Sequence, residues 1–132
     1  LAALGEQVVQ SLAGRPADES PAAAMRQVVG AIVDVREHDP EKLRRLSVAI
    51  FETPALLARY LERQAGWRSA LTGELARRMG LDPVRDLLPG LTVATAFAIH
   101  ESALRTWVAG DGRFDLDALL DEGFAHVLPI DR

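Results

Sequence analysis

The chain has 132 residues, a size typical of one domain, and 48% of them are hydrophobic, which is enough for a sizeable core. It contains no cysteine, which excludes disulfides and thiolate zinc sites, and its net charge of -4 argues against this chain alone binding a nucleic-acid backbone. No basic region followed by an apolar run marks a signal peptide, so we expect a cytoplasmic protein that stays off membranes.

Helix boundaries are marked where a side-chain acceptor precedes a proline, at Ser20-Pro21, Asp39-Pro40, Thr53-Pro54 and Asp82-Pro83. Ser, Thr and Asp accept hydrogen bonds from the free N–H groups of a first helical turn, and proline suits the first helical position. Left-handed residues that end helices are predicted at Gly14, Gly80 and Gly110. No stretch alternates as a strand does, so these marks predict an all-α fold.

Together with the 3.6-residue period of apolar positions, the marks predict six helices. They span Leu1–Ala13, Pro21–Glu37, Pro40–Glu52, Pro54–Met79, Asp86–Ala109 and Leu116–Leu128, the last of them capped by Asp115. The inward stripe of the third helix is predicted as Leu43, Leu46, Ile50 and Phe51. Because the connections are short, we expect one domain in which consecutive helices are neighbours in an orthogonal or antiparallel bundle.

The fifth predicted helix, Asp86–Ala109, is apolar on nearly every side, so it must be covered from more than one direction. It is judged too short and too interrupted for a membrane span. One face carries large side chains and a His-Glu pair, and the neighbouring face is mostly small. We therefore expect a central helix that contacts its own core on one face and a partner on another.

A homodimer is predicted, in which the last two helices of two copies form a four-helix bundle. Gly123 in the last helix supports close packing, because a glycine inside a helix costs about 1 kcal/mol relative to alanine. The alternative is that other helices of the same chain cover these faces. The candidate interface residues are Leu91, Ala94, Ala98, Ser102, Arg105, Leu120, Gly123 and Phe124.

A candidate pocket for a small apolar or amphipathic molecule is lined by aromatic, Met and polar side chains of the inward faces. Buried Tyr and Trp need partners for their polar atoms, which ranks them above the other aromatic residues. For each member the alternative is ordinary core packing. The candidate pocket residues are Met25, Phe51, Tyr60, Gln64, Trp67, Phe97, His100, Glu101 and Leu104.

No motif in the sequence indicates catalysis or a metal. The histidines (His38, His100 and His126) lack metal-ligand spacing, and the acidic run Asp111–Glu122 has Leu116 where a calcium loop requires glycine. We expect no cofactor, no metal and no enzymatic activity. Two alternatives are a helical binding protein or enzyme with His100 as a general base, and a ligand-free interaction module.

Two segments resemble the C-terminal regulatory domain of TetR-family transcriptional repressors, of the type found in regulators of the mycofactocin system. They are ALLARYLERQAGWRSALTGELARRMGLDP (Ala55–Pro83) and LRTWVAGDGRFDLDALLDEGFAHV (Leu104–Val127). The resemblance implies a ligand cavity, a four-helix dimer interface and a preceding three-helix DNA-binding domain, through which ligand binding releases operator DNA. The leucine start fits a truncation just after that domain. Pocket residues vary in this family, so the resemblance does not identify the ligand.

Overall fold

The computed structural model describes residues 2–36, 39–111 and 113–130. These residues form six helices and no strand, which confirms the all-α fold class. The predicted ends Leu1 and Glu37 lie outside the described residues, and the other bounds agree with the prediction to within one residue. The helices are α1 (Ala2–Ala13), α2 (Pro21–Arg36), α3 (Pro40–Glu52), α4 (Pro54–Met79), α5 (Leu87–Ala109) and α6 (Leu116–Val127).

The predicted helix caps are present at three of the expected positions. Ser20, Asp39 and Asp115 each accept a hydrogen bond from an N–H group in the first turn of the helix that follows. Thr53 precedes α4 but makes no side-chain cap hydrogen bond. Three helix starts are thus stabilised by side chains, and the start of α4 relies on proline at its first position.

The segment between α4 and α5 differs from the prediction, because Asp82 and Pro83 begin a turn and not a helix. The Asp82 carboxylate accepts hydrogen bonds from the N–H groups of Val84 and Arg85, at 2.7 and 3.1 Å. The Asp86 carboxylate in turn accepts from the Asp82 N–H group at 2.7 Å. These bonds hold a closed turn, and α5 begins only after it.

The glycine prediction is confirmed at one helix end and wrong at the others. Gly80 follows α4 with φ 68°, in the left-handed region. Gly110 has φ −78°, and the residue after it, Asp111, takes the left-handed conformation with φ 56°. Among the described glycines Gly80 alone has positive φ, so Gly14 does not end α1 in this way.

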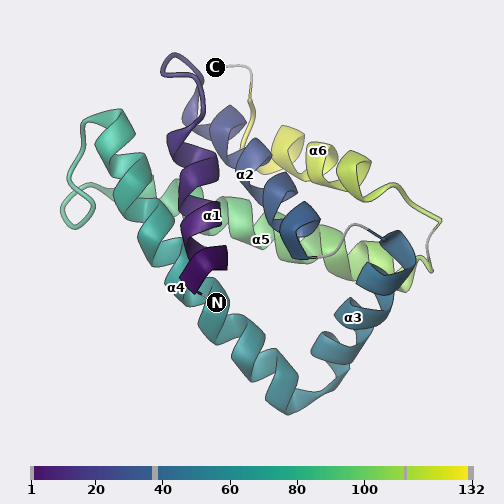
Figure 1. Cartoon of the computed structure of the whole chain (residues 1–132). Coiled ribbons are helices and arrows are strands. Elements are labelled where there is room, and N and C mark those ends of the chain that lie inside the picture. Colours follow the sequence, from purple (N-terminus) through teal and green to yellow (C-terminus); the bar gives the residue numbers. More distant parts are fainter. Residues whose placement is uncertain (1, 37–38, 112, 131–132) are drawn as a thin grey trace.

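Helix α5 runs through the middle of the molecule and packs against α2, α4 and α6, with a smaller contact to α3 (Figure 1). Helices α3, α4 and α5 form the three sides of a triangle in this view, and α1 crosses in front of α4. Ile130, the last described residue, lies beside the end of the loop between α1 and α2, where the Ser20 hydroxyl donates to the Ile130 carbonyl at 3.3 Å. Helix α5 is therefore the helix against which most of the other helices pack.

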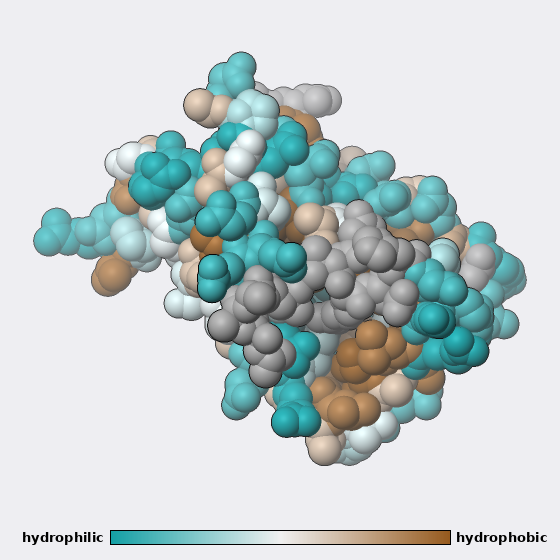
Figure 2. Space-filling view, viewed as in Figure 1, coloured by the Kyte–Doolittle hydropathy of each residue, from teal (hydrophilic) through white to brown (hydrophobic). Residues whose placement is uncertain are grey.

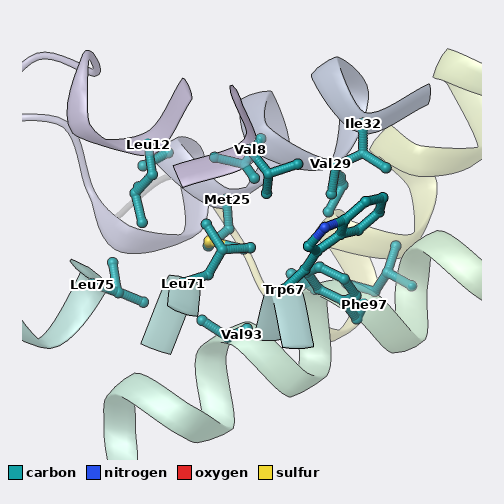
Figure 3. Packing of buried hydrophobic residues seen from close by; sticks show 14 of the residues in the cluster. Val8, Leu12, Met25, Val29, Ile32, Trp67, Leu71, Leu75, Val93 and Phe97 are labelled. Atoms are coloured by element: carbon teal, nitrogen blue, oxygen red, sulfur yellow. The ribbon is translucent and has the colours of Figure 1, made fainter. Parts of the chain in front are cut away.

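The main core lies where α1, α2, α4, α5 and α6 meet, and it is built from aliphatic side chains around Trp67 and Phe97 (Figure 3). Met25 and Leu71 are fully buried within it. A smaller cluster at the other end of α5 contains Leu43, Leu104 and Trp107. Both clusters use α5, which explains why its sequence is apolar on several sides.

The buried face of α3 is rotated from the prediction. Leu46, expected inside, is 40% exposed, whereas Ser47 is 2% exposed. Leu43 and Ser47 are one helical turn apart and both point inward. Figure 2 shows an apolar patch over the region where α3 meets α4, and the exposed large apolar side chains of these two helices are Leu46, Leu56 and Leu61.

Helix α5 is 23 residues long and, by length and composition, apolar enough to cross a membrane. The expectation that it is too short was therefore wrong. Half of its most apolar window is buried against the other helices of the chain. A core helix passes the same test of length and composition, and the packing of α5 is that of a core helix.

Candidate functional site

Polar side chains are buried on α3, α4 and α5, the helices of the triangle, and among them are Ser47, Tyr60, Gln64 and His100. Their exposed fractions are 2% for Ser47, 5% for Tyr60, 6% for Gln64 and 1% for His100. Buried polar groups carry a desolvation cost unless they find hydrogen-bond partners. Among the described residues, Ser47 Oγ and Gln64 Nε2 have no such partner. The triangle therefore holds unused hydrogen-bonding capacity next to its apolar side chains.

A hollow of about 380 Å³ lies between α4 and α5, and we call it the α4–α5 hollow. Three of the predicted pocket residues, Gln64, Phe97 and Glu101, meet there. Four of its lining residues are polar or charged, and the other four are apolar or small. Its lining consists of Leu61, Gln64, Arg68, Ala94, Phe97, Ala98, Glu101 and Ser102.

The other predicted pocket residues lie in packed regions. Met25 and Trp67 belong to the main core, and Leu104 belongs to the smaller cluster. Phe51 and Tyr60 meet edge to face, with ring centroids 5.9 Å apart. These contacts are the ordinary packing that was the alternative for each residue.

His100 is buried on α5, one turn beyond Phe97, with their ring centroids 6.4 Å apart. Only 1% of its surface is exposed. A general base must come within hydrogen-bond reach of its substrate. This structure offers His100 no direct access to a molecule arriving from solvent.

Glu101 forms its ion pair at the surface of α5 and not with the buried polar residues. Its Oε2 atom accepts from Arg105 Nε at 3.1 Å, one turn along the helix. The Arg105 guanidinium lies over the Phe51 ring, 4.1 Å from its centroid, which joins α5 to α3. Arg105 was predicted at the dimer interface, but it reaches toward α3.

A second hollow, of about 580 Å³, lies between α5 and α6, and we call it the α5–α6 hollow. Four of the predicted interface residues, Ala94, Ala98, Ser102 and Gly123, are part of its lining. A Cβ atom on Gly123 would stand 2.5 Å from Ile99 Cγ2, so the missing side chain allows α6 to approach α5 closely. The close packing expected of Gly123 is thus present within the chain.

Two predicted interface residues are wrong as surface residues. Leu120 is 1% exposed and Phe124 is fully buried, and both belong to the main core. They point inward because α6 must cover α2 and α5 with its large apolar side chains. Leu91, by contrast, is 49% exposed at the start of α5 and is available to a partner.

A small ridge on α5 separates the two hollows. Ala94, Ala98 and Ser102 line both the α4–α5 hollow and the α5–α6 hollow. Ala98 and Ser102 are exposed, and Ala94 is half-buried. The ridge is low because none of its side chains extends beyond a methyl or hydroxymethyl group.

Two residues of these regions were missed in the sequence. Arg68 lines the α4–α5 hollow and lies one turn from Gln64, so the helical spacing of α4 places it on the same side. Ser47 lies one turn from Leu43, and its spacing likewise indicated an inward position. The helical spacing indicated both positions, but the prediction of buried positions used the apolar residues alone.

A further hollow of about 610 Å³ lies where α2 and α3 meet the ends of α5 and α6, and it contains none of the predicted pocket residues. It is acidic, but its acids already have roles. Asp39 and Asp115 cap α3 and α6, and Glu41 pairs with Arg44 at 3.1 Å. The part of the chain that the structure describes has no group of three potential metal-ligating side chains, and His38 lies outside it.

The family profile of the MftR C-terminal domain matches residues 19–130. A curated relative, the HTH-type transcriptional regulator TcmR of Streptomyces glaucescens, is 30% identical over 113 residues. That alignment covers 81% of this chain and 50% of the relative. The chain therefore spans about half the length of the relative that it matches.

Proposed function

The chain belongs to the MftR C-terminal domain family of TetR-type transcriptional regulators, and from this premise we propose that it senses a small effector and forms a homodimer. Regulators of this type generally bind small-molecule effectors, dimerise and bind DNA. The domain has no enzymatic role in this proposal. It acts in the cytoplasm, where a regulator meets its operator.

The position of α5 carries the proposal. On one side it lines the α4–α5 hollow with Phe97 and Glu101, and on the other it lines the α5–α6 hollow with Ala103. A ligand in the first hollow contacts the same helix that a partner copy contacts in the second. An element placed in this way passes a change at one site to the other, as regulation requires.

Operator binding is assigned to a helix-turn-helix domain joined to the start of α1, as the name of the relative indicates for that protein. The net charge of -4 supports this assignment, because phosphate backbones are bound by basic surfaces. Effector binding would change the distance between the DNA-binding domains of the two subunits.

Two copies are proposed to pack through α5 and α6 as a four-helix bundle. The faces involved are small and partly apolar, and Leu91 and Val127 extend them with exposed side chains. Exposed apolar surface of this kind commonly marks a protein–protein contact. A two-fold axis along the α5–α6 hollow would bring Ala98 of one copy close to the same region of the other.

An arginine at Ala98 tests the interface, because it places a long charged side chain where two helices should meet. Light scattering after size exclusion should give a dimer mass for the unchanged chain at micromolar concentration and a monomer mass for Ala98→Arg. Ala70→Arg is the matched control, since Ala70 is exposed on α4 and lines neither hollow. An unchanged mass for Ala98→Arg would remove this face from the interface.

A thermal-shift screen of apolar and amphipathic metabolites tests effector sensing. A compound that binds the native state raises the melting temperature, by an amount that grows with its concentration above Kd. A ligand-free interaction module would give no such compound. An enzyme using His100 would retain its binding and lose turnover in His100→Gln, whereas a sensor has no turnover to lose.

A further inference from the structure

The α4–α5 hollow is lined by a cation, Arg68, which takes part in none of the ion pairs of the described residues. Arg68 also lines another hollow, beside Thr72 and Gly90, and the residue is exposed. An arginine in such a place is available to an anion from outside the chain.

Gln64 adds a buried donor one turn away from Arg68 on the same helix. It is 6% exposed and lines the hollow, and its Nε2 atom has no hydrogen-bond partner among the described residues. Rotation about the last side-chain bond of glutamine is soft, so the amide can turn its N–H groups toward the hollow. A ligand with an acceptor there would satisfy a donor that is otherwise unpaired.

The α5 wall of the hollow carries a carboxylate, but its charge does not remove the preference of the hollow for an acceptor. The Glu101 carboxylate is held by Arg105 at 3.1 Å, which offsets its charge. Ser102, one residue further along α5, contributes a hydroxyl group that can donate. Arg68, Gln64 and Ser102 therefore give one hollow three residues that can donate, and its carboxylate is already paired.

The other lining residues of the hollow determine which kind of ligand body fits beside these donors. Leu61 is 48% exposed, Phe97 is 5% exposed, and Ala94 and Ala98 are small, so these side chains offer an apolar trough. A hollow of about 380 Å³ holds a small molecule and not a folded partner. The shape and the donors together require a molecule with one apolar part and one acceptor end.

We infer that the effector is an amphipathic carboxylate, whose carboxylate binds Arg68 and Gln64 and whose apolar part lies along Leu61 and Phe97. This inference rests on the proposed effector-sensing function and names the chemical class that the α4–α5 hollow takes. A guanidinium can hold a carboxylate by two parallel hydrogen bonds, which gives the site a strong preference for an anion over a neutral alcohol.

Three probes of equal chain length and different head groups test the inference: decanoate, decan-1-ol and decylamine. Each is titrated into the full isotope-labelled chain while nuclear magnetic resonance follows the side-chain amide of Gln64 and the backbone of Ala94 and Ala98. Decanoate should shift these signals with saturation, and its affinity should exceed that of decan-1-ol by about tenfold or more, the difference expected of a charged hydrogen bond.

Arg68→Gln should weaken decanoate binding by about tenfold and leave decan-1-ol binding unchanged, because only the carboxylate uses the guanidinium. Gln64→Leu should weaken decanoate binding by a smaller factor. Arg63→Gln is the matched control, since Arg63 is an exposed arginine of the same helix that lies outside the hollow, and it should change neither affinity.

Equal binding of the three probes, or decanoate binding that Arg68→Gln does not weaken, would overturn the inference. So would decanoate that leaves the signals of the hollow unchanged. Binding of the alcohol or the amine at these signals without decanoate would overturn the carboxylate class and leave effector sensing standing. The proposed function fails on different measurements, namely a monomer mass together with no stabilising compound in the thermal-shift screen.

Discussion

Gly123 is the residue at which α6 comes closest to α5. Replacing it with alanine should destabilise the chain by about 1–3 kcal/mol, because the added methyl group overpacks the contact with Ile99. The loss should appear although alanine is intrinsically favoured in a helix by about 1 kcal/mol. Urea unfolding followed by circular dichroism measures the change in the free energy of unfolding.

Gly73→Ala on α4 is the matched control, because no atom lies within 4 Å of its added Cβ atom. It should stabilise the chain by roughly 0.5–1 kcal/mol through helix propensity alone. Combining Gly123→Ala with Ile99→Ala should cost less than the sum of the two single changes, since the second removes the clashing side chain. Additive losses would show that the clash does not set the cost.

Glu19 links stability to pH through its pair with Arg15. Both nitrogen–oxygen distances of the pair are 2.7 Å, and the hydrogen bonds from Arg15 lower the pKa of the Glu19 carboxyl below its ordinary value. A depressed pKa in the folded state means stabilisation above the unfolded pKa, lost as the pH falls through the folded pKa.

Glu19→Gln should therefore be less stable than the unchanged chain at about pH 7, and the difference should shrink toward about pH 3, as the carboxyl becomes protonated in the folded state as well. The effect should be small and should fall further with added salt, because both side chains are partly exposed. Urea unfolding at both pH values checks this, and a constant difference would exclude the carboxyl charge as its source.

At the scale of helices, Asp39 and Thr53 stand in the same position before a proline but act differently. The Asp39 carboxylate accepts from the N–H groups of Glu41 and Lys42, at 2.9 and 3.4 Å, whereas Thr53 makes no side-chain cap bond. Asp39→Ala should cost about 1 kcal/mol of stability, and Thr53→Ala clearly less. Equal losses in urea unfolding would contradict this reading of the two caps.

Most of the fold could be predicted because the start of each helix depends on residues close to it in the sequence. A capping side chain and a proline act within one turn, so the starts of α3 and α4 at Pro40 and Pro54 agree with the prediction. The same signal at Asp82 began only a turn, which is closed by the hydrogen bond from the Asp82 N–H group to the Asp86 carboxylate. A hydrogen bond to a residue four positions further along is not visible in a dipeptide.

The candidate site was less predictable, because the apolar face of a helix does not show which other element packs against it. Ala98 and Ser102, which were predicted to face a partner copy, are exposed on α5. Leu120 and Phe124 were placed on a surface although α6 needs them to cover its own core. Arg68 was overlooked because its role depends on which helix lies opposite, and that is a property of tertiary packing.

For the whole molecule, the two hollows on α5 predict reciprocal coupling between effector and dimer. If decanoate binding changes the dissociation constant of the dimer, dimerisation must change the affinity for decanoate by the same factor. Sedimentation with and without saturating decanoate should reveal a change of about fivefold or more. The Arg63→Gln chain should show the same change, and the Arg68→Gln chain should not at the same decanoate concentration. No change in the unchanged chain would mean that α5 does not connect the sites.

The low ridge of Ala94, Ala98 and Ser102 has a consequence for redesign and for divergence between related sensors. Any larger side chain on this ridge alters both hollows at once, so ligand preference and subunit pairing cannot be tuned there independently. The α4 wall offers separate control, because Leu61 and Arg68 line the α4–α5 hollow and not the α5–α6 hollow. To obtain a biosensor that binds a new ligand but still forms the same dimer, residues of α4 should be varied. To obtain subunits that do not pair with each other, residues of α6 should be varied.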